Sequence, residues 1–308
     1  MACDMEIAVI GAGPAGLAAG LTAARLGRRA ALFEHRAIGG QIATAAHIDN
    51  YPGFPSGGSG PDLAFAILDQ ARGHGLEHRG DEVKAVRVEH GHFTLATTGE
   101  SVRAGAVILA MGSRRRPLGL VRESELSQGR GVSTCATCDA PFHRDRPVTV
   151  VGGGDTALDE ALCLAQHCSR VTVVHRGDRV RAAHPLRSRA EESERIDFIA
   201  HTEIVALLGE ETLTGVRLRD QTTGEETDWP TDALFVCIGG IPNSELVRDL
   251  VDVNDVGRIV VDPLCLQTRT PGLFAAGGVR VGSTRKVIGC VADGCVTAGE
   301  ADKFLGQR

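Results

Sequence analysis

The sequence CATCD, residues 135–139, places two thiols at the spacing of a redox couple. Two cysteines that are separated by two residues can close a small disulfide, and this arrangement lowers thiol pKa values and permits disulfide exchange. Asp139 adjoins Cys138, and a carboxylate at that point can give a proton to a departing thiolate. We therefore predict that Cys135, Cys138 and Asp139 are catalytic residues.

Two other interpretations of this cysteine pair are open. A structural zinc site needs four ligands, usually in two paired clusters, whereas no second CxxC or histidine pair stands near residues 135–139 in the sequence. We therefore expect no metal site. A pair of thiols without a role is the second alternative, and Asp139 can also serve as the N-cap of the turn that follows it.

A glycine-rich motif near the N-terminus, GAGPAG at residues 11–16, separates a short apolar stretch from an Ala/Leu-rich one. In this pattern Gly11 permits a tight turn, Gly13 lets the backbone approach a pyrophosphate, and Gly16 lets a helix pack on a strand. Glu34 ends the next apolar stretch, where a carboxylate accepts hydrogen bonds from ribose hydroxyls and repels a 2′-phosphate. The site therefore predicts a nucleotide such as FAD or NAD.

A second motif, GGGDTA at residues 152–157, repeats this pattern with Gly152, Gly154 and Ala157 at the three positions. The strand that follows ends without an acid, and cationic side chains take its place: His175, Arg176, Arg179 and Arg181. Guanidinium groups pair with phosphate through two hydrogen bonds, so this site predicts a nucleotide with a 2′-phosphate, NADPH. The alternative for these arginines is a solvated basic face.

Both motifs must be positioned by strand-turn-helix-strand units, which is the order of the apolar patterns around them. These units predict strands at 6–10, 29–34, 147–151 and 170–176 and helices at 17–27 and 158–168. Further apolar runs predict strands at 82–90, 92–98, 106–112, 196–201, 215–220, 233–239 and 257–262. A last helix is expected within 291–305, beginning after Asp293 and Gly294.

Composition excludes several classes of protein. The chain has 308 residues, about twice a typical domain of ~150 residues, so one large or two medium domains are expected. Its net charge of -6 and its 4% aromatic content argue against a nucleic-acid partner. No apolar run reaches the ~18 residues of a membrane helix, and no signal peptide is predicted. Nine cysteines without a framework pattern fit reduced thiols, so we expect a cytoplasmic protein.

Seven motifs, taken together and in this order, resemble those of the low-molecular-weight thioredoxin reductases over essentially the whole chain. They are GAGPAG, GGQ (39–41), DNYPGFP (49–55), CATCD, VVGGGDTALDEAL, HRGDRVRA and FVCIGGIPN. The resemblance implies an α/β fold of two Rossmann-like dinucleotide-binding domains, with the NADPH domain inserted into the FAD domain. The FAD domain would then comprise residues 1–115 and 245–308, and residues 116–244 would bind NADPH and carry the CxxC.

The same resemblance implies a homodimer that passes electrons from NADPH through FAD and the CxxC disulfide to thioredoxin or a thioredoxin-like protein. Cys138 would face the flavin ring, Cys135 would attack the partner disulfide, and Asp139 would act as the acid. The inserted domain has to present both NADPH and the dithiol to one flavin. The resemblance therefore implies that this domain rotates between two orientations. The hinges would lie in 113–119 and 239–245.

The resemblance also implies the cofactor contacts. Those to FAD would be Gly11, Gly13, Pro14, Ala15, Gly16, Glu34, Gly39, Gly40, Gln41, Asn50, Gly112, Gly278, Val279, Arg285, Lys286 and Val287. Those to NADPH would be Gly152, Gly154, Asp155, Thr156, His175, Arg176, Arg181 and Ile238.

Four positions depart from the family pattern. Gly177 replaces the second arginine of the pair that begins with Arg176, Gly278 replaces an aspartate, Lys286 replaces a glutamine, and Cys290 is introduced. These changes leave two alternatives open. One is a related flavoprotein that reduces another disulfide or oxygen, as a dithiol oxidase does. The other is a redox-sensing, flavin-binding protein without turnover.

Overall fold

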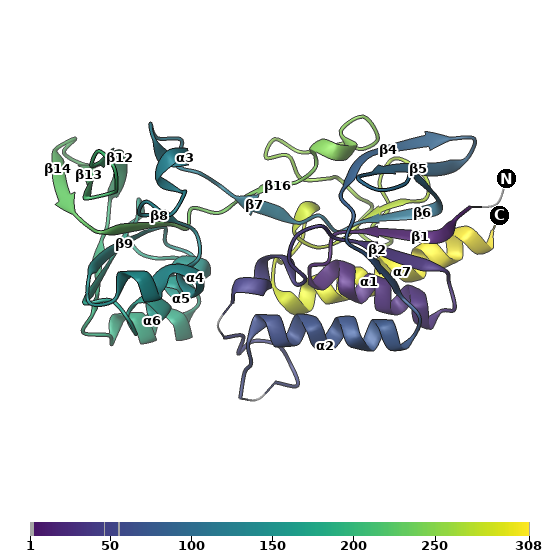
Figure 1. The fold of residues 1–308 in the computed structure, drawn as a ribbon, viewed down its shortest axis with the longest axis horizontal. Helices are drawn as coiled ribbons and strands as arrows, with labels where there is room; N and C mark the ends of the chain where they lie inside the picture. The colour runs from purple at the N-terminus through teal and green to yellow at the C-terminus, as the bar shows by residue number, and fades with distance from the viewer. Residues whose placement is uncertain (1–2, 46, 55, 308) are drawn as a thin grey trace. The chain divides into compact units, whose positions relative to one another are not determined.

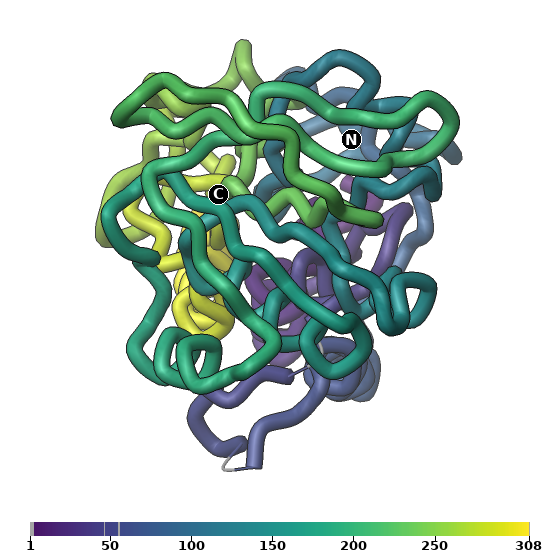
Figure 2. The backbone as a smooth tube through the Cα atoms, turned by 90° about the vertical axis from the view of Figure 1, so that its left-hand side faces the viewer, coloured from purple at the N-terminus to yellow at the C-terminus, as the bar shows by residue number. Residues whose placement is uncertain are grey.

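The computed structural model describes residues 3–45, 47–54 and 56–307. Pro55 of the DNYPGFP motif lies outside the described residues. The chain forms two compact units: unit 1 is Met1–Arg114 with Ile241–Arg308, and unit 2 is Arg115–Gly240. Unit 2 is therefore one continuous stretch of backbone inserted into unit 1, and it is the teal-to-green part of the trace in Figure 2.

Unit 1 contains a seven-stranded sheet in the order β3-β2-β1-β6-β5-β4, with β17 also paired to β6. The strands are β1 Met5–Ile10, β2 Ala30–Phe33, β3 Glu77–Arg79, β4 Val83–Glu89, β5 His92–Thr97, β6 Val102–Leu109 and β17 Leu273–Ala275. The β1–β2, β2–β3, β1–β6 and β6–β17 pairs are parallel. Almost all side chains of β1, β2 and β6 are buried, as expected for parallel strands that are covered on both faces of the sheet.

Three helices belong to unit 1: α1 Pro14–Arg25, α2 Gly60–Gly73 and α7 Val287–Gly306. Figure 1 shows α7, from the C-terminal end of the chain, beside α1 from its N-terminal end. A Cβ at Gly294 would lie 2.2 Å from the Ala15 carbonyl oxygen, so the two helix backbones approach closely there. The unit also has short 3-10 helices: η1 Gly40–Thr44, η3 Glu245–Val247 and η4 Gly277–Val279.

Unit 2 contains a parallel five-stranded sheet in the order β11-β10-β9-β15-β8 and an antiparallel three-stranded sheet in the order β12-β13-β14. The strands are β8 Val132–Ser133, β9 Pro147–Val151, β10 Arg170–Val174, β11 Ile196–Ile199, β12 Thr202–Leu208, β13 Gly215–Asp220, β14 Glu226–Pro230 and β15 Ala233–Val236. The helices are α3 Glu123–Leu126, α4 Ala136–Asp139, α5 Asp155–Leu164, α6 His184–Glu191 and the 3-10 helix η2 Ala140–His143. Two separate apolar clusters form the core of this unit.

The two crossings of the chain between the units pair with each other. Strand β7, Ser113–Arg115, and strand β16, Gly240–Pro242, form a two-stranded sheet, which Figure 1 labels. Next to it the Arg116 N–H donates to the Gly239 carbonyl at 2.9 Å. The chain therefore enters and leaves unit 2 through one paired ribbon, which we call the junction.

The predicted α/β class is confirmed: unit 1 combines helices with a mixed sheet in which β4–β5 and β5–β6 are antiparallel, and unit 2 combines helices with a parallel sheet. One strand prediction was wrong, because within 257–262 Ile259 makes only isolated bridges, to Val253 and Arg280. The predicted start of the last helix was also wrong, because α7 begins at Val287. Gly294 lies inside this helix, where close contact with another helix requires glycine.

Candidate functional site

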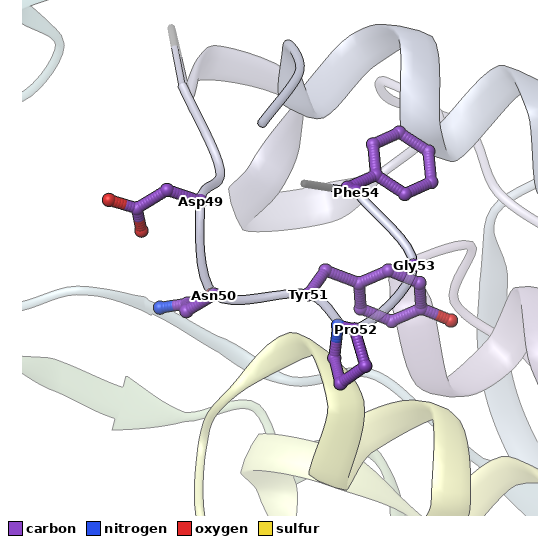
Figure 3. Close-up of a pocket in the computed structure, with 6 residues that line it drawn as sticks. All are labelled: Asp49, Asn50, Tyr51, Pro52, Gly53 and Phe54. Atoms are coloured by element: carbon purple, nitrogen blue, oxygen red, sulfur yellow. The ribbon is translucent and has the colours of Figure 1, made fainter. Parts of the chain in front are cut away.

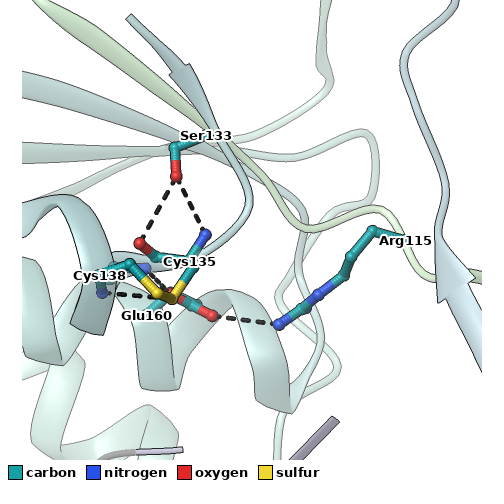
Figure 4. Close-up of a disulfide and its surroundings, with 6 residues drawn as sticks. Arg115, Ser133, Cys135, Cys138 and Glu160 are labelled. Carbon is teal, nitrogen blue, oxygen red and sulfur yellow. Dashed lines mark hydrogen bonds and ion pairs between the residues drawn. A yellow bond between two sulfur atoms is a disulfide. The ribbon is translucent and has the colours of Figure 1, made fainter. Parts of the chain in front are cut away.

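The Cys135–Cys138 pair forms a disulfide at the start of helix α4, shown in Figure 4. The Cys138 N–H donates to Cys135 Sγ at 3.2 Å, so the first sulfur caps the helix that contains the second. The Ser133 hydroxyl accepts the Cys135 N–H at 3.1 Å. Cys135 is half-buried and Cys138 is exposed. The loop is thus held by local hydrogen bonds while one sulfur remains open to solvent.

Asp139 ends helix α4 and is half-buried. It stands at the N-cap position of η2, but its side chain makes no capping hydrogen bond there. The structure therefore gives no support to the alternative in which Asp139 is an N-cap. Its role as an acid remains a prediction.

A buried ion pair next to the disulfide was not predicted. Glu160 on α5 has only 8% of its surface exposed, and its carboxylate accepts the N–H of Ala136. Arg115 donates to the same carboxylate at 3.2 Å. Burial raises the pKa of Glu160, although the Ala136 N–H and Arg115 act in the opposite direction. The sequence contained one signal for a buried carboxylate: Glu160 lies three residues after Ala157, on the same buried face of α5.

The first glycine motif forms the turn between β1 and α1. Gly11 has a φ of +101°, and a Cβ there would lie 2.6 Å from the Ala110 carbonyl oxygen. At Gly16 a Cβ would lie 1.7 Å from the Gly11 carbonyl oxygen, whereas at Gly13 the nearest atom would be 4.0 Å away. Gly11 and Gly16 thus serve the turn and the packing, and the backbone at Gly13 faces open space that suits an approaching phosphate.

Other predicted FAD residues surround this turn. Glu34, directly after β2, accepts the Ala12 N–H at 3.1 Å, and the Gly39 N–H donates to the Ala12 carbonyl at 2.8 Å. A Cβ at Gly40 would lie 3.2 Å from the Gly13 Cα. These contacts bring the acid and the start of η1 against the glycine turn, as a nucleotide site requires.

Gln41 and Gly112 lie at the carboxyl end of the same sheet. The Gln41 amide donates to both the carbonyl and the hydroxyl of Ser113 at 2.8 Å. Gly112 follows β6, and a Cβ placed there would meet nothing within 4 Å. Pro14 and Ala15 open helix α1. The predicted residues of the N-terminal part of unit 1 therefore gather at the end of the parallel strands, where open α/β sheets bind ligands.

The C-terminal segment contributes Gly278 and Val279, which lie in η4. A Cβ at Gly278 would have the Gly112 Cα as its nearest neighbour, at 4.0 Å. Lys286 is the N-cap residue of α7, directly before Val287, and Arg285 precedes it with a φ of +55°.

Asn50 lines an open pocket of about 580 Å³ with its neighbours Asp49, Tyr51, Pro52, Gly53 and Phe54, and Figure 3 shows how these side chains diverge. Asn50 lies in the loop before α2 and not in the glycine turn. Its assignment to the flavin side therefore stays a prediction.

The second glycine motif forms the turn between β9 and α5. Gly152 has a φ of +139°, and a Cβ there would lie 2.2 Å from the Cys237 carbonyl oxygen. At Gly154 a Cβ would meet nothing within 4 Å. Asp155 accepts the Ala183 N–H at 2.8 Å, and Thr156 is exposed in the first turn of α5. This turn therefore repeats the arrangement of the first one.

The cationic residues after β10 divide into two kinds. His175 is only 6% exposed, and burial lowers its pKa, whereas a hydrogen bond with the backbone of Gly177 acts in the opposite direction. Its assignment to the NADPH site stays a prediction. Arg176, Arg179 and Arg181 are exposed, and the Arg181 N–H donates to the Gly153 carbonyl at 2.5 Å. Ile238, the remaining predicted residue, is partly buried against an apolar cluster of unit 2.

The fold and the two kinds of site define a class of protein: two glycine turns that suit dinucleotides, and a disulfide in the inserted unit. The chain belongs to the pyridine nucleotide-disulphide oxidoreductase family, whose model matches residues 5–294. Within it the chain belongs to the thioredoxin reductases, because curated members of that group match nearly its whole length. FAD and NADPH are therefore its cofactors, and the open backbone at Gly13 and Gly154 fits two dinucleotides.

Three comparisons illustrate this relationship. The chain is 40% identical to a thioredoxin reductase of Mycolicibacterium smegmatis, covering 98% of this chain and 97% of the relative. It is 41% identical to a bifunctional thioredoxin reductase/thioredoxin of Mycobacterium leprae, covering 98% of this chain and 66% of that protein. The crystal structure of a Lactococcus lactis thioredoxin reductase is 33% identical, with a TM-score of 0.96, and the match covers 99% of this chain and 100% of that one.

Among the helices that the structure describes, none is long and apolar enough to cross a membrane. Within the same described residues, no group of three or more His, Cys, Asp and Glu side chains could hold a metal ion.

Proposed function

We propose that this chain reduces thioredoxin or a thioredoxin-like protein with electrons from NADPH. The observation that supports this most directly is the surface disulfide between Cys135 and Cys138 in the unit that carries the second glycine turn. Bound FAD would supply the chemistry that accepts the hydride of NADPH and passes its two electrons to a disulfide. The protein's own part is to bind both nucleotides, orient them and carry out the thiol chemistry.

The nucleotide roles follow from charge and space. The glycine turn of unit 1 offers open backbone at Gly13, and Glu34 beside it accepts hydrogen bonds from ribose hydroxyls. The turn of unit 2 offers open backbone at Gly154, with exposed Arg176 and Arg181 for a 2′-phosphate. This distribution supports FAD in unit 1 and NADPH in unit 2.

The thiol chemistry is a disulfide exchange. The Cys135 thiolate attacks one sulfur of the partner disulfide, the partner's second sulfur leaves as a thiolate, and Asp139 gives it a proton. The Cys138 thiolate then attacks Cys135 Sγ, which restores the Cys135–Cys138 disulfide and releases the partner's first thiol. The two electrons thus end on the partner, which gains two thiols.

Two further features of this function are proposed. One relative joins a thioredoxin reductase and a thioredoxin in one bifunctional protein, which supports thioredoxin as the partner. Seven cysteines besides Cys135 and Cys138 are free, which supports a reducing compartment such as the cytoplasm. We also propose a homodimer, on the family resemblance, and light scattering of the purified protein tests it.

Serine variants test the central assignment. Cys135→Ser and Cys138→Ser are each expected to abolish NADPH-dependent reduction of thioredoxin, because each removes one half of the relay. NADPH is still expected to bleach the bound flavin, because that step precedes the thiols. Cys295→Ser, which removes an exposed free cysteine, serves as the control. Retained thioredoxin reduction in both active-site variants would show that the pair is not the relay.

The same assay separates the alternative acceptors. NADPH oxidation by the FAD-loaded protein is measured with and without thioredoxin, and with and without oxygen. Oxidation that needs thioredoxin supports the proposal. Oxidation that proceeds with oxygen alone and responds to Cys135→Ser would instead identify a dithiol oxidase, and a failure to turn over with any acceptor would identify a binding protein.

A further inference from the structure

The ion pair between Arg115 and Glu160 lies beside the redox disulfide but has no part in the relay described above. Figure 4 shows the Arg115 guanidinium beside the Glu160 carboxylate, to which it donates a hydrogen bond. The same carboxylate accepts a hydrogen bond from the loop that contains the two cysteines. The bonded group is the N–H of Ala136, which belongs to the same peptide as the Cys135 carbonyl. One oxygen of the Glu160 carboxylate is therefore hydrogen-bonded to the amide group that joins Cys135 to Ala136.

Within the pair, the Glu160 carboxylate is nearly buried and the Arg115 guanidinium is partly exposed. The Glu160 side chain is 9% exposed and that of Arg115 is 28% exposed. Charges in such positions interact more strongly with their neighbours than surface charges do, because less water screens them. Other groups around Glu160 are Asp159 and Cys163 on the same helix and Cys237 after β15. Arg115 acts on the Glu160 carboxylate as a cation, and Asp159 acts on it as a like charge.

Reduction of the disulfide changes the charge that this pair meets. The Cys135–Cys138 bond takes up two electrons and two protons to give two thiols, and in a CxxC motif one of these ionises readily. A carboxylate beside that thiolate opposes its negative charge, and the guanidinium bound to the carboxylate offsets this effect. The two members of the pair therefore act in opposite directions on the reduced state.

We propose that the Arg115–Glu160 pair sets the reduction potential of the Cys135–Cys138 couple. Glu160 is a positioning residue that holds the peptide after Cys135 and also supplies a negative charge, and Arg115 is its counter-charge. The inference rests on the proposed function only in requiring that this couple cycles between disulfide and dithiol.

The test measures the couple at equilibrium in the full-length, FAD-loaded protein. Samples are incubated at pH 8 in mixtures of reduced and oxidised dithiothreitol, where one dithiothreitol dithiol is oxidised for each protein disulfide that is reduced. Thiols are then alkylated, and mass spectrometry of the peptide with Cys135 and Cys138 gives the reduced fraction. The variants are Glu160→Gln, Arg115→Met and the double variant. Glutamine keeps an oxygen that can accept the Ala136 N–H.

Opposite shifts are expected from the single variants. Glu160→Gln should favour the dithiol by about three- to tenfold, a tenfold change being about 30 mV for a two-electron couple. Arg115→Met should favour the disulfide by a similar factor, and the double variant should lie near the parent. Asp228→Asn and Arg217→Met remove the same charges from the exposed pair on β13 and β14, and should change the equilibrium by less than about 1.5-fold.

Shifts of both single variants in one direction, or no shift in either, would overturn the proposal and leave a structural contact only. Circular dichroism checks the fold of each variant. If Arg115→Met does not fold, Glu160→Asp against Glu160→Gln decides, because aspartate keeps the charge and should stay within about twofold of the parent. Since dithiothreitol replaces the protein partner, failure with thioredoxin would count against the proposed function without changing this result.

Discussion

The residue with the clearest functional consequence in the second nucleotide site is Gly177. It follows Arg176 in the loop after β10, and a Cβ at this position would lie 3.4 Å from the Arg179 carbonyl oxygen, an ordinary contact. Its φ does not lie in the left-handed region. The backbone therefore accepts a larger residue here.

Gly177→Arg is expected to raise the preference for NADPH over NADH. A second guanidinium adds a charged hydrogen bond to the 2′-phosphate, worth about 1.5–3 kcal/mol, so the NADPH/NADH ratio of kcat/KM should rise about 10- to 100-fold. Steady-state kinetics with both nucleotides measure this ratio. Gly177→Ala is the control for the backbone change, and a ratio in the arginine variant equal to that of the alanine variant would mean that the loop points away from the ribose.

Gly278→Asp is expected to tighten FAD binding. The resemblance implies an aspartate at this position, for which we propose a hydrogen bond from the ribityl chain, and the atom nearest to a new Cβ would be the Gly112 Cα at 4.0 Å. One charged hydrogen bond is worth about 1.5–3 kcal/mol. Titration of the apoprotein with FAD measures the change.

The nearby Asp293 makes Gly278→Asn the right control. The Asp293 carboxylate accepts the Gly277 N–H at 2.9 Å, so a second carboxylate brings a like charge close to it. Asparagine offers an acceptor without that charge. Tighter binding by both variants supports the hydrogen bond, whereas weaker binding by both would show that this chain has compensated for glycine.

The sequence predicted the cysteine pair and both glycine turns, because each of these features depends on residues that are close together in the chain. It did not predict Arg115 and Glu160, which are far apart in sequence and meet only in the folded unit. It also did not show that His175 is buried, which lowers its pKa.

Among the elements, α7 shows best how glycine has different roles within one helix. A Cβ at Gly294 would lie 2.2 Å from the Ala15 carbonyl oxygen and 2.8 Å from the Ala19 nitrogen, both backbone atoms. At Gly299, in the same helix, a Cβ would meet nothing within 4 Å. The first glycine permits the contact between α1 and α7, and the second has no such role.

Gly294→Ala is expected to destabilise unit 1 by about 1–3 kcal/mol, because overpacking forces the two helices apart. Gly299→Ala should instead stabilise it by about 0.5–1 kcal/mol, because alanine has less backbone entropy to lose in a helix. Urea unfolding followed by circular dichroism compares the two. Equal changes in the free energy of unfolding would contradict the close approach of these helices.

Strands with continuous apolar runs were predicted well, because burial on both faces leaves a strong pattern; β9, Pro147–Val151, was predicted to the residue. Helix α2 was not predicted, although Ser59 accepts the Asp62 N–H at its start and thus provides a capping signal. The strand predicted at 257–262 has the right composition but only isolated bridges, which depend on neighbours from other parts of the chain.

At the scale of the whole molecule, unit 2 is a candidate for independent folding. It has its own sheets, apolar clusters on two sides of the larger sheet and ends that meet in the junction. Residues 115–240 expressed alone are expected to melt cooperatively, as followed by circular dichroism, and to form the Cys135–Cys138 disulfide. A fragment of residues 134–240 lacks β8 and buried Leu126, and should not. A gradual melt of the longer fragment would show that unit 2 depends on unit 1.

Arg115 is shared by two structures described above: it ends strand β7 of the junction, and it neutralises Glu160 beside the disulfide. Thermodynamic linkage makes any coupling between them reciprocal. If bending of the junction draws Arg115 away from Glu160, the couple becomes harder to reduce, and reduction of the couple must in turn disfavour the bent junction by the same free energy. The oxidation state of two sulfur atoms and the conformation of a backbone strand would then be two readouts of one equilibrium.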